Sequence, residues 1–591
     1  MLNLKRPAWL DSIGTSSGNN ETGSNSPAIA KRAVFVVIFL SLLFSGLLVR
    51  LYHIQVTGHK KYLEQQKAQC YLKVAIQPKA GMIFSRNGKL LAISNLVYSV
   101  YADPQIVKDN PQTINTFCRT LGLPVQEIQT KINSLAEKEK HFIWIKRRIS
   151  ESEFKILKEL NLAGVGFQEE YKRFYPNGSL ACHILGYRGI DEQALDGVEL
   201  SYDELLMGEC GYRWVPRDAR QKKISSLELI SQTPRPGKNV YLTIDTTIQF
   251  IAEEELNRAC EKWKPLSAST IVLDPRTGEV LGLANRPNFD PNYYNKYSDE
   301  ARRNRIITDQ YEPGSTAKPL TAAALLDNSL VGLNNKFFCE NGIFKTGFRT
   351  IHDHHPYGQL TFTEIISQSS NIGMAKLGLL LGKEKMYTYI KRFGLGESTG
   401  LGLPGETSGL VTPYRQWDKF TITSVPMGHE VAVTTMQLAK AYLPFANGGY
   451  LLRPQVISKI TGEEEIIKQN NTEIIRQIFS QRTAQQMKSI LIDVVNNGTG
   501  SQAKIPNYQI AGKTGTTTKL NPDGTYSHQR FISLFVGFAP ADNPRILVLA
   551  VVDEPKGAYY GGTVATPIVT EIITKTLKYW GIPGRIPVAQ R

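Results

Sequence analysis

The chain has 591 residues, 41% of them hydrophobic and 21% charged, and its formal net charge is +16 at pH 7. Single hydrophobic cores stop growing near about 250–300 residues, so this length predicts two or more domains, and the composition excludes a disordered or polytopic chain. The positive charge fits an anionic neighbour such as lipid headgroups, a pyrophosphate-bearing substrate or nucleic acid. Because no zinc-finger spacing, RNA-binding signature or basic run interleaved with aromatics appears, nucleic-acid binding is not expected.

An uncharged apolar run occupies residues 33–49 (AVFVVIFLSLLFSGLLV), with Lys31 and Arg32 before it and Arg50 after it. About 17–25 such residues cross the hydrocarbon of a membrane, and Arg50 can snorkel to the interface, so we predict a transmembrane anchor over residues 33–50. A cleaved signal peptide is the alternative, but no small-x-small cleavage site follows. The polar residues 1–32 are expected to form a disordered cytoplasmic tail, although the basic residues flanking the span are too evenly matched to fix its orientation.

The rest of the chain divides into two regions. Residues 51–240 mix short strand-like and helical pieces with turn signals and show no catalytic constellation. Early in residues 241–580, the stretch STIVLDPRTGEVLGLAN (269–285) shows two β-rich runs joined by a Pro/Gly turn, which predicts a hairpin. Helical stretches follow, and NYQIAGKTG, FISLFVGFA and ILVLAVVD are expected to form strands. We therefore predict an α+β domain whose sheet is built from both ends of this region and covered by helices, with a short tail at 581–591.

The six cysteines lie far apart, and no C-x-x-C pair indicates a zinc or redox site. We expect buried thiols. A disulfide is admissible in an oxidising compartment, but the sequence does not choose among the fifteen full pairings. The residues concerned are Cys70, Cys118, Cys182, Cys210, Cys260 and Cys339.

Ser315 and Lys318 form an S-x-x-K motif in YEPGSTAKPLTAAALL, where Pro313 and Gly314 interrupt the chain and an alanine- and leucine-rich helix is expected to begin. The spacing of three places both side chains on one helical face. Near a helix N-terminus the macrodipole opposes a positive charge, so Lys318 could lose its proton and serve as a base for Ser315. Alone the motif is weak, since chance gives about two or three S-x-x-K matches in such a chain.

Two further motifs accompany the first one. Ser369-Ser370-Asn371 lies in SQSSNIGMAKLGLLLG, and Lys513-Thr514-Gly515-Thr516 lies in QIAGKTGTTTK. The motifs S-x-x-K, S-D-N and K-T-G in this order are the signature of penicillin-recognising serine enzymes, and here Ser370 replaces the central Asp. Each motif by itself could be a set of capping or loop residues or a strand end. The three in this order indicate an acyl-transfer site.

The first two motifs match the proton-transfer steps of such a reaction. Ser315 would attack a peptide carbonyl, and a neutral Lys318 would accept its proton. Ser369 could relay a proton to the leaving amine, while Asn371 offers a donor and an acceptor to the substrate amide. The backbone N–H groups of Ser315 and Thr516 are the expected oxyanion hole.

The third motif suits the binding of a peptide with a terminal carboxylate. Lys513 would supply positive charge, and the hydroxyl groups of Thr514 and Thr516 could hold the carboxylate. Gly515 would let an extended peptide lie close to the strand edge, as in strand addition.

With these motifs, the sequence resembles the class B penicillin-binding proteins, the monofunctional transpeptidases, over roughly residues 70–575. The match also rests on RFYPNGSLACHILGY (173–187), LDGVELSYDELLMG (195–208), LDPRTGEVLGLANRPNFDPN (273–292) and YYGGTVATP (559–567). EPGST and the serine at position 370 make the chain most similar to the septal, FtsI type. The family's usual Arg-Gly and Asp-Arg-Asn-Gly appear here as Ala80-Gly81 and Ser85-Arg86-Asn87-Gly88, a departure that leaves the catalytic motifs intact.

This resemblance implies a penicillin-binding, serine β-lactamase-like transpeptidase domain (residues 241–580) with a five-stranded antiparallel sheet flanked by helices. It also implies a non-catalytic pedestal of mixed α/β structure and dimerisation type (residues 51–240). By the same resemblance, the large part of the chain lies outside the cytoplasmic (inner) membrane, in the periplasm or its equivalent, at the division septum. Neither a metal nor an organic cofactor is implied.

The implied reaction begins when the penultimate D-Ala of one stem peptide acylates Ser315 and the terminal D-Ala leaves. An amine of a second stem, on lipid-linked precursor or nascent glycan, then takes the acyl group. β-Lactams would also acylate Ser315. Glycan polymerisation would be left to an FtsW-type membrane glycosyltransferase acting with other division proteins.

Three alternatives stay open. A D,D-carboxypeptidase or β-lactamase would resolve the acyl-enzyme with water. A β-lactam sensor or non-catalytic division scaffold would not turn over, although a sensor needs an output module that the polar tail does not offer. His352, Asp353, His354 and His355 suggest a metal site, but neighbouring residues on an extended strand point to opposite faces, and a loop beside Ser369 is the simpler interpretation.

Overall fold

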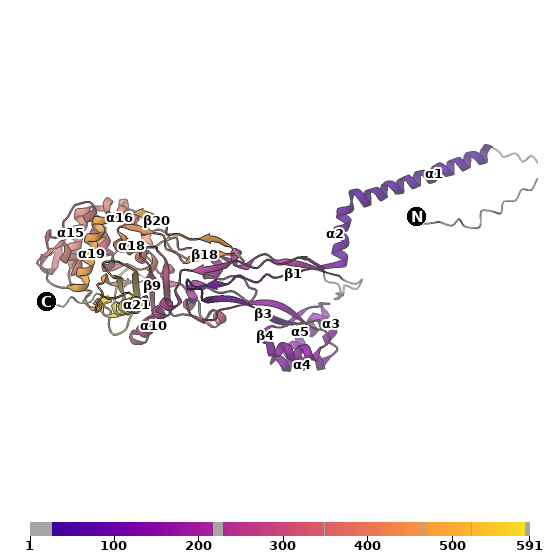
Figure 1. Ribbon diagram of the computed structural model, residues 1–591, viewed down its shortest axis with the longest axis horizontal. Helices are drawn as coiled ribbons and strands as arrows, with labels where there is room; N and C mark the ends of the chain where they lie inside the picture. The colour runs from indigo at the N-terminus through magenta and orange to yellow at the C-terminus, as the bar shows by residue number, and fades with distance from the viewer. Residues whose placement is uncertain (1–26, 217–228, 348, 463–464, 522, 585–591) are drawn as a thin grey trace, which may run out of the picture. The chain divides into compact units, whose positions relative to one another are not determined.

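The computed structural model describes residues 27–216, 229–347, 349–462, 465–521 and 523–584 (Figure 1). The expected tail at residues 1–26 and residues 585–591 of the expected C-terminal tail lie outside this part of the chain. The chain forms two compact units: Met1–Ile76 with Tyr212–Thr233, and Gln77–Gly211 with Pro234–Arg591.

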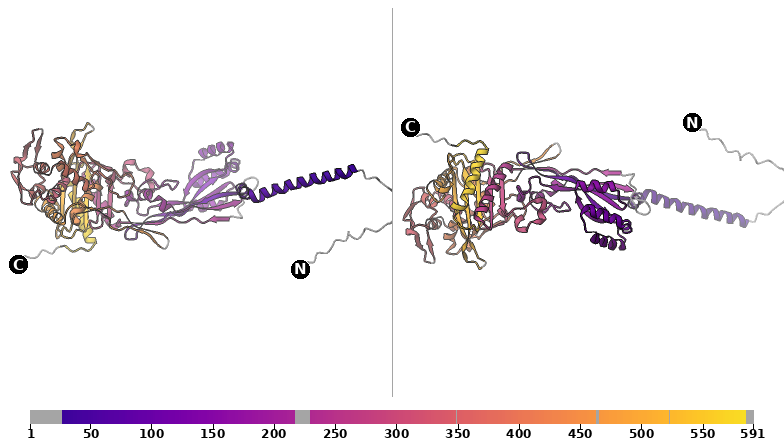
Figure 2. Two further views of the ribbon diagram at one scale, coloured as in Figure 1. Left: turned by 90° about the horizontal axis from the view of Figure 1, so that it is seen from above. Right: turned by 90° about the horizontal axis from the view of Figure 1, so that it is seen from below.

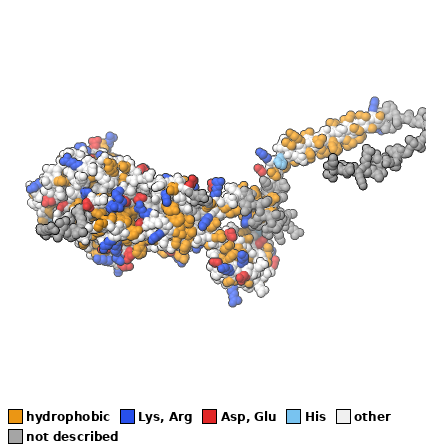
Figure 3. Space-filling model, viewed as in Figure 1, with side chains coloured by type: hydrophobic (Ala, Val, Ile, Leu, Met, Phe, Trp, Pro, Cys, Tyr) orange, Lys and Arg blue, Asp and Glu red, His pale blue; other side chains and the backbone are white. Residues whose placement is uncertain are grey.

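The first unit contains a long apolar helix. α1 (Pro27–Tyr52) continues into a π-helical turn, η1 (His53–Thr57), and α2 (His59–Cys70) follows. A three-stranded sheet has the order β1 (Tyr71–Ile76), β6 (Gly211–Pro216), β7 (Leu229–Gln232). Among the described residues, one helical segment, Ala30–Thr57, is long and apolar enough to cross a membrane. Its apolar side chains are exposed along its length (Figure 3).

This helix is longer than the span that the sequence predicted over residues 33–50. Residues 27–32, assigned to a disordered tail, are helical, and helical structure continues past Arg50 to Thr57. The prediction took the flanking charges as the limits of the element. Lys and Arg are good helix formers, however, so the backbone hydrogen bonds extend beyond the apolar run.

The second unit begins with a sheet and its own small core. The central strand β3 (Leu90–Ala102) pairs antiparallel with β4 (Ile143–Ile149) and β5 (Val165–Phe174). Apolar faces of nearby helices pack on these strands in a separate hydrophobic cluster. The main helices here are α4 (Pro111–Leu121), α5 (Val125–Glu137) and α6 (Glu151–Leu160), with shorter ones at α3 (Pro104–Val107), α7 (Cys182–Leu185), α8 (Gly197–Ser201) and α9 (Asp203–Met207).

The expected domain boundary at residue 240 falls inside a strand. β8 (Asn239–Leu242) pairs parallel with β2 (Ile83–Phe84) and antiparallel with β18 (Ile457–Thr461), which also pairs with β19 (Ile466–Gln469). One sheet, in the order β19-β18-β8-β2-β3-β4 with β5 on β3, therefore includes strands from both sides of residue 240. The two parts consequently form one compact unit.

A five-stranded antiparallel sheet organises the remainder of the second unit. Its order is β10 (Val280–Arg286), β9 (Ser267–Leu273), β23 (Ile546–Asp553), β22 (Tyr526–Ala539), β21 (Ala511–Leu520). The predicted hairpin is thus β9–β10, and the three predicted C-terminal strands complete the sheet. The predicted five-stranded fold is confirmed, with β21 at an edge.

Helices cover both faces of this sheet (Figures 1 and 2). Alternate residues of β23 enter two different cores: Leu547 and Leu549 join one cluster, whereas Val548 and Ala550 join the other. α10 (Thr246–Trp263) and α21 (Thr566–Tyr579) cover the second face, and α18 (Thr435–Asn447) lies on the first. Further helices around the first core are α13 (Lys318–Asp327), α14 (Phe362–Ser367), α15 (Asn371–Leu381), α16 (Lys383–Arg392) and α19 (Gln481–Asn496).

Short antiparallel pairs of strands lie in the loops around this sheet. They are β11 (Lys336–Phe338) with β14 (Gln359–Thr361), β12 (Ile343–Lys345) with β13 (Thr350–His352), β15 (Leu410–Val411) with β16 (Val431–Ala432), and β17 (Tyr450–Leu452) with β20 (Ile474–Gln477). The β12–β13 pair leads directly into the His352–His355 segment that the metal hypothesis used.

The cysteines follow the expectation of buried thiols only in part. Cys118, Cys182 and Cys339 are buried and unpaired, but Cys210, the residue before β6, is exposed. Cys260 is half-buried and also free, and the side chain of Cys70 lies outside the described residues.

Candidate active site

Ser315 lies in a tight turn that precedes the predicted helix. Gly314–Ala317 form a 3-10 turn, η3, and α13 begins at Lys318 with Pro319 in its first turn, as expected. A 3-10 helix has three residues per turn, so Ser315 and Lys318 stack above one another. Ser315 is half-buried, and its hydroxyl group makes no hydrogen bond to any of the described residues. The hydroxyl group is therefore available to a substrate.

Lys318 is fully buried beside the middle motif. Its Nζ donates to the Ser369 carbonyl oxygen at 2.5 Å, to Ser369 Oγ at 3.1 Å and to Asn371 Oδ1 at 2.8 Å. Burial lowers the pKa of Lys318 to about 7, and the carboxylate of Asp353 opposes this shift. The predicted neutral amine thus has a physical basis, but its main cause is desolvation rather than the helix dipole that the sequence analysis invoked.

The backbone of the middle motif is strained at Ser369. This residue has a φ of +58°, a left-handed conformation that costs a non-glycine residue on the order of 1–3 kcal/mol. It reverses the chain between α14 and α15, and the hydroxyl group thereby comes within reach of Lys318. Ser370 is the N-cap of α15, and its Oγ accepts from the Gly373 N–H at 2.9 Å.

Asp353, which the sequence analysis considered only as part of a metal site, lies beside the middle motif. It lies in the His352–His355 segment, and its carboxylate contacts all of the first residues of the middle motif's helix: Ser370 Oγ, Asn371 N and Ile372 N. The segment is thus a loop beside Ser369, as the simpler interpretation held. No group of three or more metal-ligating side chains occurs among the described residues.

The third motif lies on the edge strand β21. Lys513 is fully buried, and its Nζ is 3.2 Å from the Thr514 carbonyl oxygen and 3.4 Å from Thr499 Oγ1. Burial and then the neighbouring charge of Lys318 lower the pKa of Lys513 well below its usual range. The fixed positive charge expected for Lys513 is therefore disfavoured while the site holds no anion.

The two threonines of this motif have defined partners. Thr514 Oγ1 lies 2.9 Å from Thr499 Oγ1, and Thr516 Oγ1 accepts from the Gly561 N–H at 3.0 Å. Thr499 follows α19 and has no motif that could have identified it, whereas Gly561 belongs to the YYGGTVATP stretch. Each hydroxyl group is held in place and keeps capacity for a further hydrogen bond.

Gly515 joins the first motif to the third. A Cβ atom at this position would lie 2.7 Å from Thr316 Cγ2 and 3.4 Å from the Pro313 carbonyl oxygen. The missing side chain therefore lets β21 pack directly against the turn that carries Ser315. This contact is a structural reason for the glycine beyond the close peptide approach that the sequence analysis proposed.

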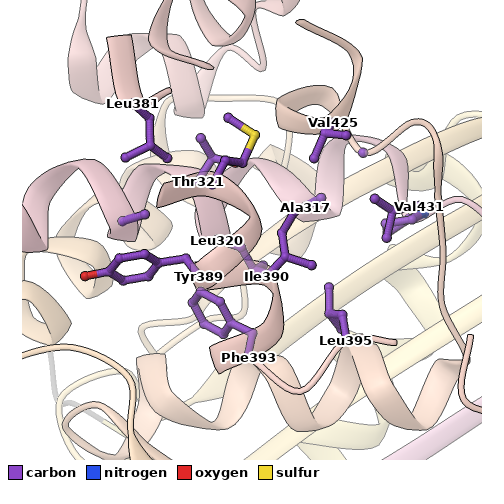
Figure 4. Close-up of a pocket in the computed structure, with 14 residues that line it drawn as sticks. Ala317, Leu320, Thr321, Leu381, Tyr389, Ile390, Phe393, Leu395, Val425 and Val431 are labelled. Carbon is purple, nitrogen blue, oxygen red and sulfur yellow. The ribbon is translucent and has the colours of Figure 1, made fainter. Parts of the chain in front are cut away.

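Mostly apolar side chains line a small cavity beside Ala317, the last residue of the Ser315 turn (Figure 4). Ala317, Leu320 and Thr321 face Tyr389 and Phe393 across a cavity of about 20 Å³, which is close to the volume that one water needs. Most of the lining is apolar. The turn consequently rests on a closely packed core.

Two family models match the chain. "Penicillin binding protein transpeptidase domain" matches residues 268–574, and "Penicillin-binding Protein dimerisation domain" matches residues 75–242. Together they cover both parts of the second unit. The first match begins at β9 and ends in α21, so it includes all nine named residues of the three motifs.

Named relatives match along most of their length. "Probable peptidoglycan D,D-transpeptidase PenA" of Neisseria meningitidis is 34% identical over 94% of this chain and 94% of its own. "Stage V sporulation protein D" of Bacillus subtilis is 34% identical over 94% of this chain and 87% of its own. "Peptidoglycan D,D-transpeptidase FtsI" of Escherichia coli is 33% identical over 92% of this chain and 91% of its own.

A solved structure agrees with these relatives. Penicillin-binding protein 3 of Mycobacterium tuberculosis, complexed with aztreonam, superposes with a TM-score of 0.69 at 27% identity and covers 87% of this chain and 99% of the other. The family models and the relatives match along both parts of the second unit, and the solved structure shares the fold over 87% of the chain. The chain therefore belongs to the class B penicillin-binding proteins, the family of peptidoglycan D,D-transpeptidases that join a dimerisation domain to a transpeptidase domain.

Proposed function

We propose that this chain cross-links stem peptides of peptidoglycan through an acyl-Ser315 intermediate. The observation that carries the proposal is the convergence of three distant segments. Lys318 Nζ contacts Ser369 and Asn371, and the turn of Ser315 packs through Thr316 on Gly515 of the third motif. A hydroxyl group, two buried amines and a carboxamide thus share one site.

Acylation follows from this arrangement. The Ser315 hydroxyl oxygen attacks the carbonyl carbon of the penultimate D-Ala, and the neutral amine of Lys318 takes the hydroxyl proton. The N–H groups of Ser315 and Thr516 stabilise the oxyanion. As the C–N bond breaks, the proton passes from Lys318 through the Ser369 hydroxyl group, 3.1 Å away, to the nitrogen of the departing D-Ala.

Deacylation reverses the proton path. The amine of a second stem peptide attacks the ester carbon and gives its proton to Lys318 by way of Ser369. The ester bond breaks, and Ser315 recovers its proton. A new amide then links the two stems, so the chain returns to its starting protonation state.

The third motif would hold the terminal carboxylate of the donor peptide. The Thr514 and Thr516 hydroxyl groups donate to it, and its negative charge raises the depressed pKa of Lys513. Binding of an anion therefore favours the protonated form of Lys513, while Lys318 acts as the base in its neutral form. The same contacts would receive the carboxylate of a β-lactam, which acylates Ser315 and leaves slowly.

The product distribution tests the reaction. Membrane-embedded protein is supplied with glycan strands that carry pentapeptide stems, and digestion products are separated by mass. Cross-linked dimers with released D-Ala support the proposal, whereas tetrapeptide monomers alone would indicate a hydrolytic carboxypeptidase or β-lactamase. Ser315→Ala should give neither product, and Ser489→Ala, at an exposed serine of α19, serves as the matched control. Turnover by Ser315→Ala would contradict the acyl-serine route.

We also infer a single-span protein whose catalytic part is extracytoplasmic and acts at the division septum. The apolar segment Ala30–Thr57 and the similarity to the FtsI relative support this. Partners would be an FtsW-type glycosyltransferase and other division proteins. Co-purification from membranes and the position of a fluorescent fusion test these assignments, and a fusion spread evenly along the cell would contradict the septal role.

A further inference from the structure

Asp353 connects the loop after β13 to the N-terminus of α15. Its Oδ1 accepts from the Asn371 N–H at 2.5 Å and from the Ile372 N–H at 3.1 Å, and its Oδ2 accepts from Ser370 Oγ at 2.6 Å. Two backbone N–H groups at the start of α15, which have no partner within the helix, thus donate to one carboxylate. This negative charge lies where the helix dipole favours it.

The same loop fixes the side chain of Asn371. Asn371 Nδ2 donates to the His352 carbonyl oxygen at 3.0 Å, and Oδ1 accepts from Lys318 Nζ at 2.8 Å. The amide therefore has one orientation, with its oxygen toward the amine. Because Asp353 holds the backbone of Asn371, this orientation depends on the carboxylate.

We propose that Asp353 is a positioning residue for Asn371 and Lys318, and that it supplies from a neighbouring loop the carboxylate that the S-D-N form of the motif carries at its centre. In this chain Ser370 occupies that central position, and its hydroxyl group donates a hydrogen bond to Asp353. The inference rests on the proposed function, because it concerns the base and the amide of that reaction.

The charges around Lys318 give the proposal a measurable consequence. Asp353 raises the pKa of Lys318, and among the described residues His354 and Lys513 are further titratable groups that interact with this amine. Both of these carry a positive charge when protonated, so Asp353 is the group that favours the charged amine. Removing its charge lowers the pKa of Lys318 further, and the amine then becomes neutral at a lower pH.

The test compares acylation by a fluorescent penicillin, as a function of pH, in full-length Asp353→Asn and wild-type protein. We expect the acid limb of the rate profile to move to lower pH by about one unit. The rate above that limb should fall about tenfold, since a neutral amide oxygen holds the Asn371 and Ile372 N–H groups more weakly than a carboxylate does, and the new Nδ2 cannot accept from Ser370 Oγ. A purely structural role would lower the rate at every pH without moving the limb.

Relocating the carboxylate provides the second arm. Ser370→Asp alone places two carboxylates in contact and should slow acylation, but Asp353→Asn with Ser370→Asp restores one charge at the helix N-terminus. We expect this double variant to recover the wild-type limb and a rate within about threefold of wild type. Asp245→Asn is the control: Asp245 is the N-cap residue of α10, and its carboxylate also accepts from two first-turn groups, the Thr247 and Ile248 N–H groups. It should leave the limb in place even if it lowers the melting temperature.

Two results would overturn the proposal: an unmoved limb in Asp353→Asn, or a double variant no faster than Asp353→Asn. Either failure is distinct from failure of the proposed function. If the proposed function itself failed, wild-type protein would not be labelled at Ser315, or Ser315→Ala would still be labelled.

Discussion

Replacing Gly515 with alanine is expected to push apart the Ser315 turn and the strand that binds the substrate. The added Cβ would lie 2.7 Å from Thr316 Cγ2, which is 0.7 Å inside the 3.4 Å where ordinary contact begins. Thr316 cannot rotate away, because it is fully buried and its Oγ1 donates to the Pro313 carbonyl oxygen at 2.6 Å. The strand and the turn must therefore separate by roughly this amount.

Such a shift has two separate costs. Overpacking a close-packed site destabilises a protein by about 1–3 kcal/mol. Misplacement of reacting groups by about 1 Å lowers a rate about a hundredfold, so a shift somewhat smaller than this should slow acylation by about tenfold or more. The rate is measured with a fluorescent penicillin, and stability is measured by thermal unfolding of the solubilised protein.

A second substitution identifies the clash as the cause. Thr316→Ser removes the obstructing Cγ2 but keeps the hydroxyl group and its hydrogen bond, so Gly515→Ala with Thr316→Ser should regain most of the lost rate. Gly282→Ala in β10 is the matched control, because its Cβ would meet no atom closer than 3.5 Å. Full activity of Gly515→Ala, or no recovery in the double variant, would refute this account.

Three further predictions concern buried charges. The acylation rate should rise with pH to a plateau above about 7, following the pKa of Lys318, and a flat profile from pH 5 to 9 would contradict a neutral lysine base. Lys318 has a lower pKa in the folded than in the unfolded protein, so the stability of the wild type relative to Lys318→Met should rise by about 1.4 kcal/mol per pH unit above about 7. Thermal unfolding of both proteins at pH 7 and 9 measures this difference. A difference that does not change with pH would refute the lowered pKa. Glu199→Gln should destabilise the protein by about 3–5 kcal/mol, because Glu199 accepts from Arg173 Nε and Arg188 Nε, each at 2.6 Å, in a buried cluster. Chemical denaturation measures this loss, and a near-zero change in the free energy of unfolding would refute it.

Patterns that depend on local periodicity could be predicted from the sequence. The β9–β10 hairpin and the strands β21, β22 and β23 follow from apolar runs between turn residues, and the long helix follows from an uncharged run. The limits of that helix could not be predicted, because charges end an apolar run without ending a helix. The sheet that contains strands from both sides of residue 240 could not be predicted either, since β8 pairs with strands far away in the sequence.

The candidate site shows the same division. The motif residues were found because their spacing and order form a known signature. Asp353 was considered only as part of a metal site, because nothing local shows that its carboxylate meets a helix N-terminus across the fold. Thr499 has no sequence signal, as a single threonine after a helix is ordinary. The strained backbone at Ser369 could not be predicted from the sequence either, because tertiary contacts impose it.

Covalent labelling at Ser315 is the most direct test of the central claim. Full-length protein is incubated with a penicillin, digested, and searched by mass spectrometry for the peptide that carries the adduct. The account predicts one modified residue, Ser315, in the YEPGSTAK sequence, and loss of the adduct in Ser315→Ala and in Lys318→Met. An adduct on another residue, or the absence of any adduct on folded wild-type protein, would contradict it.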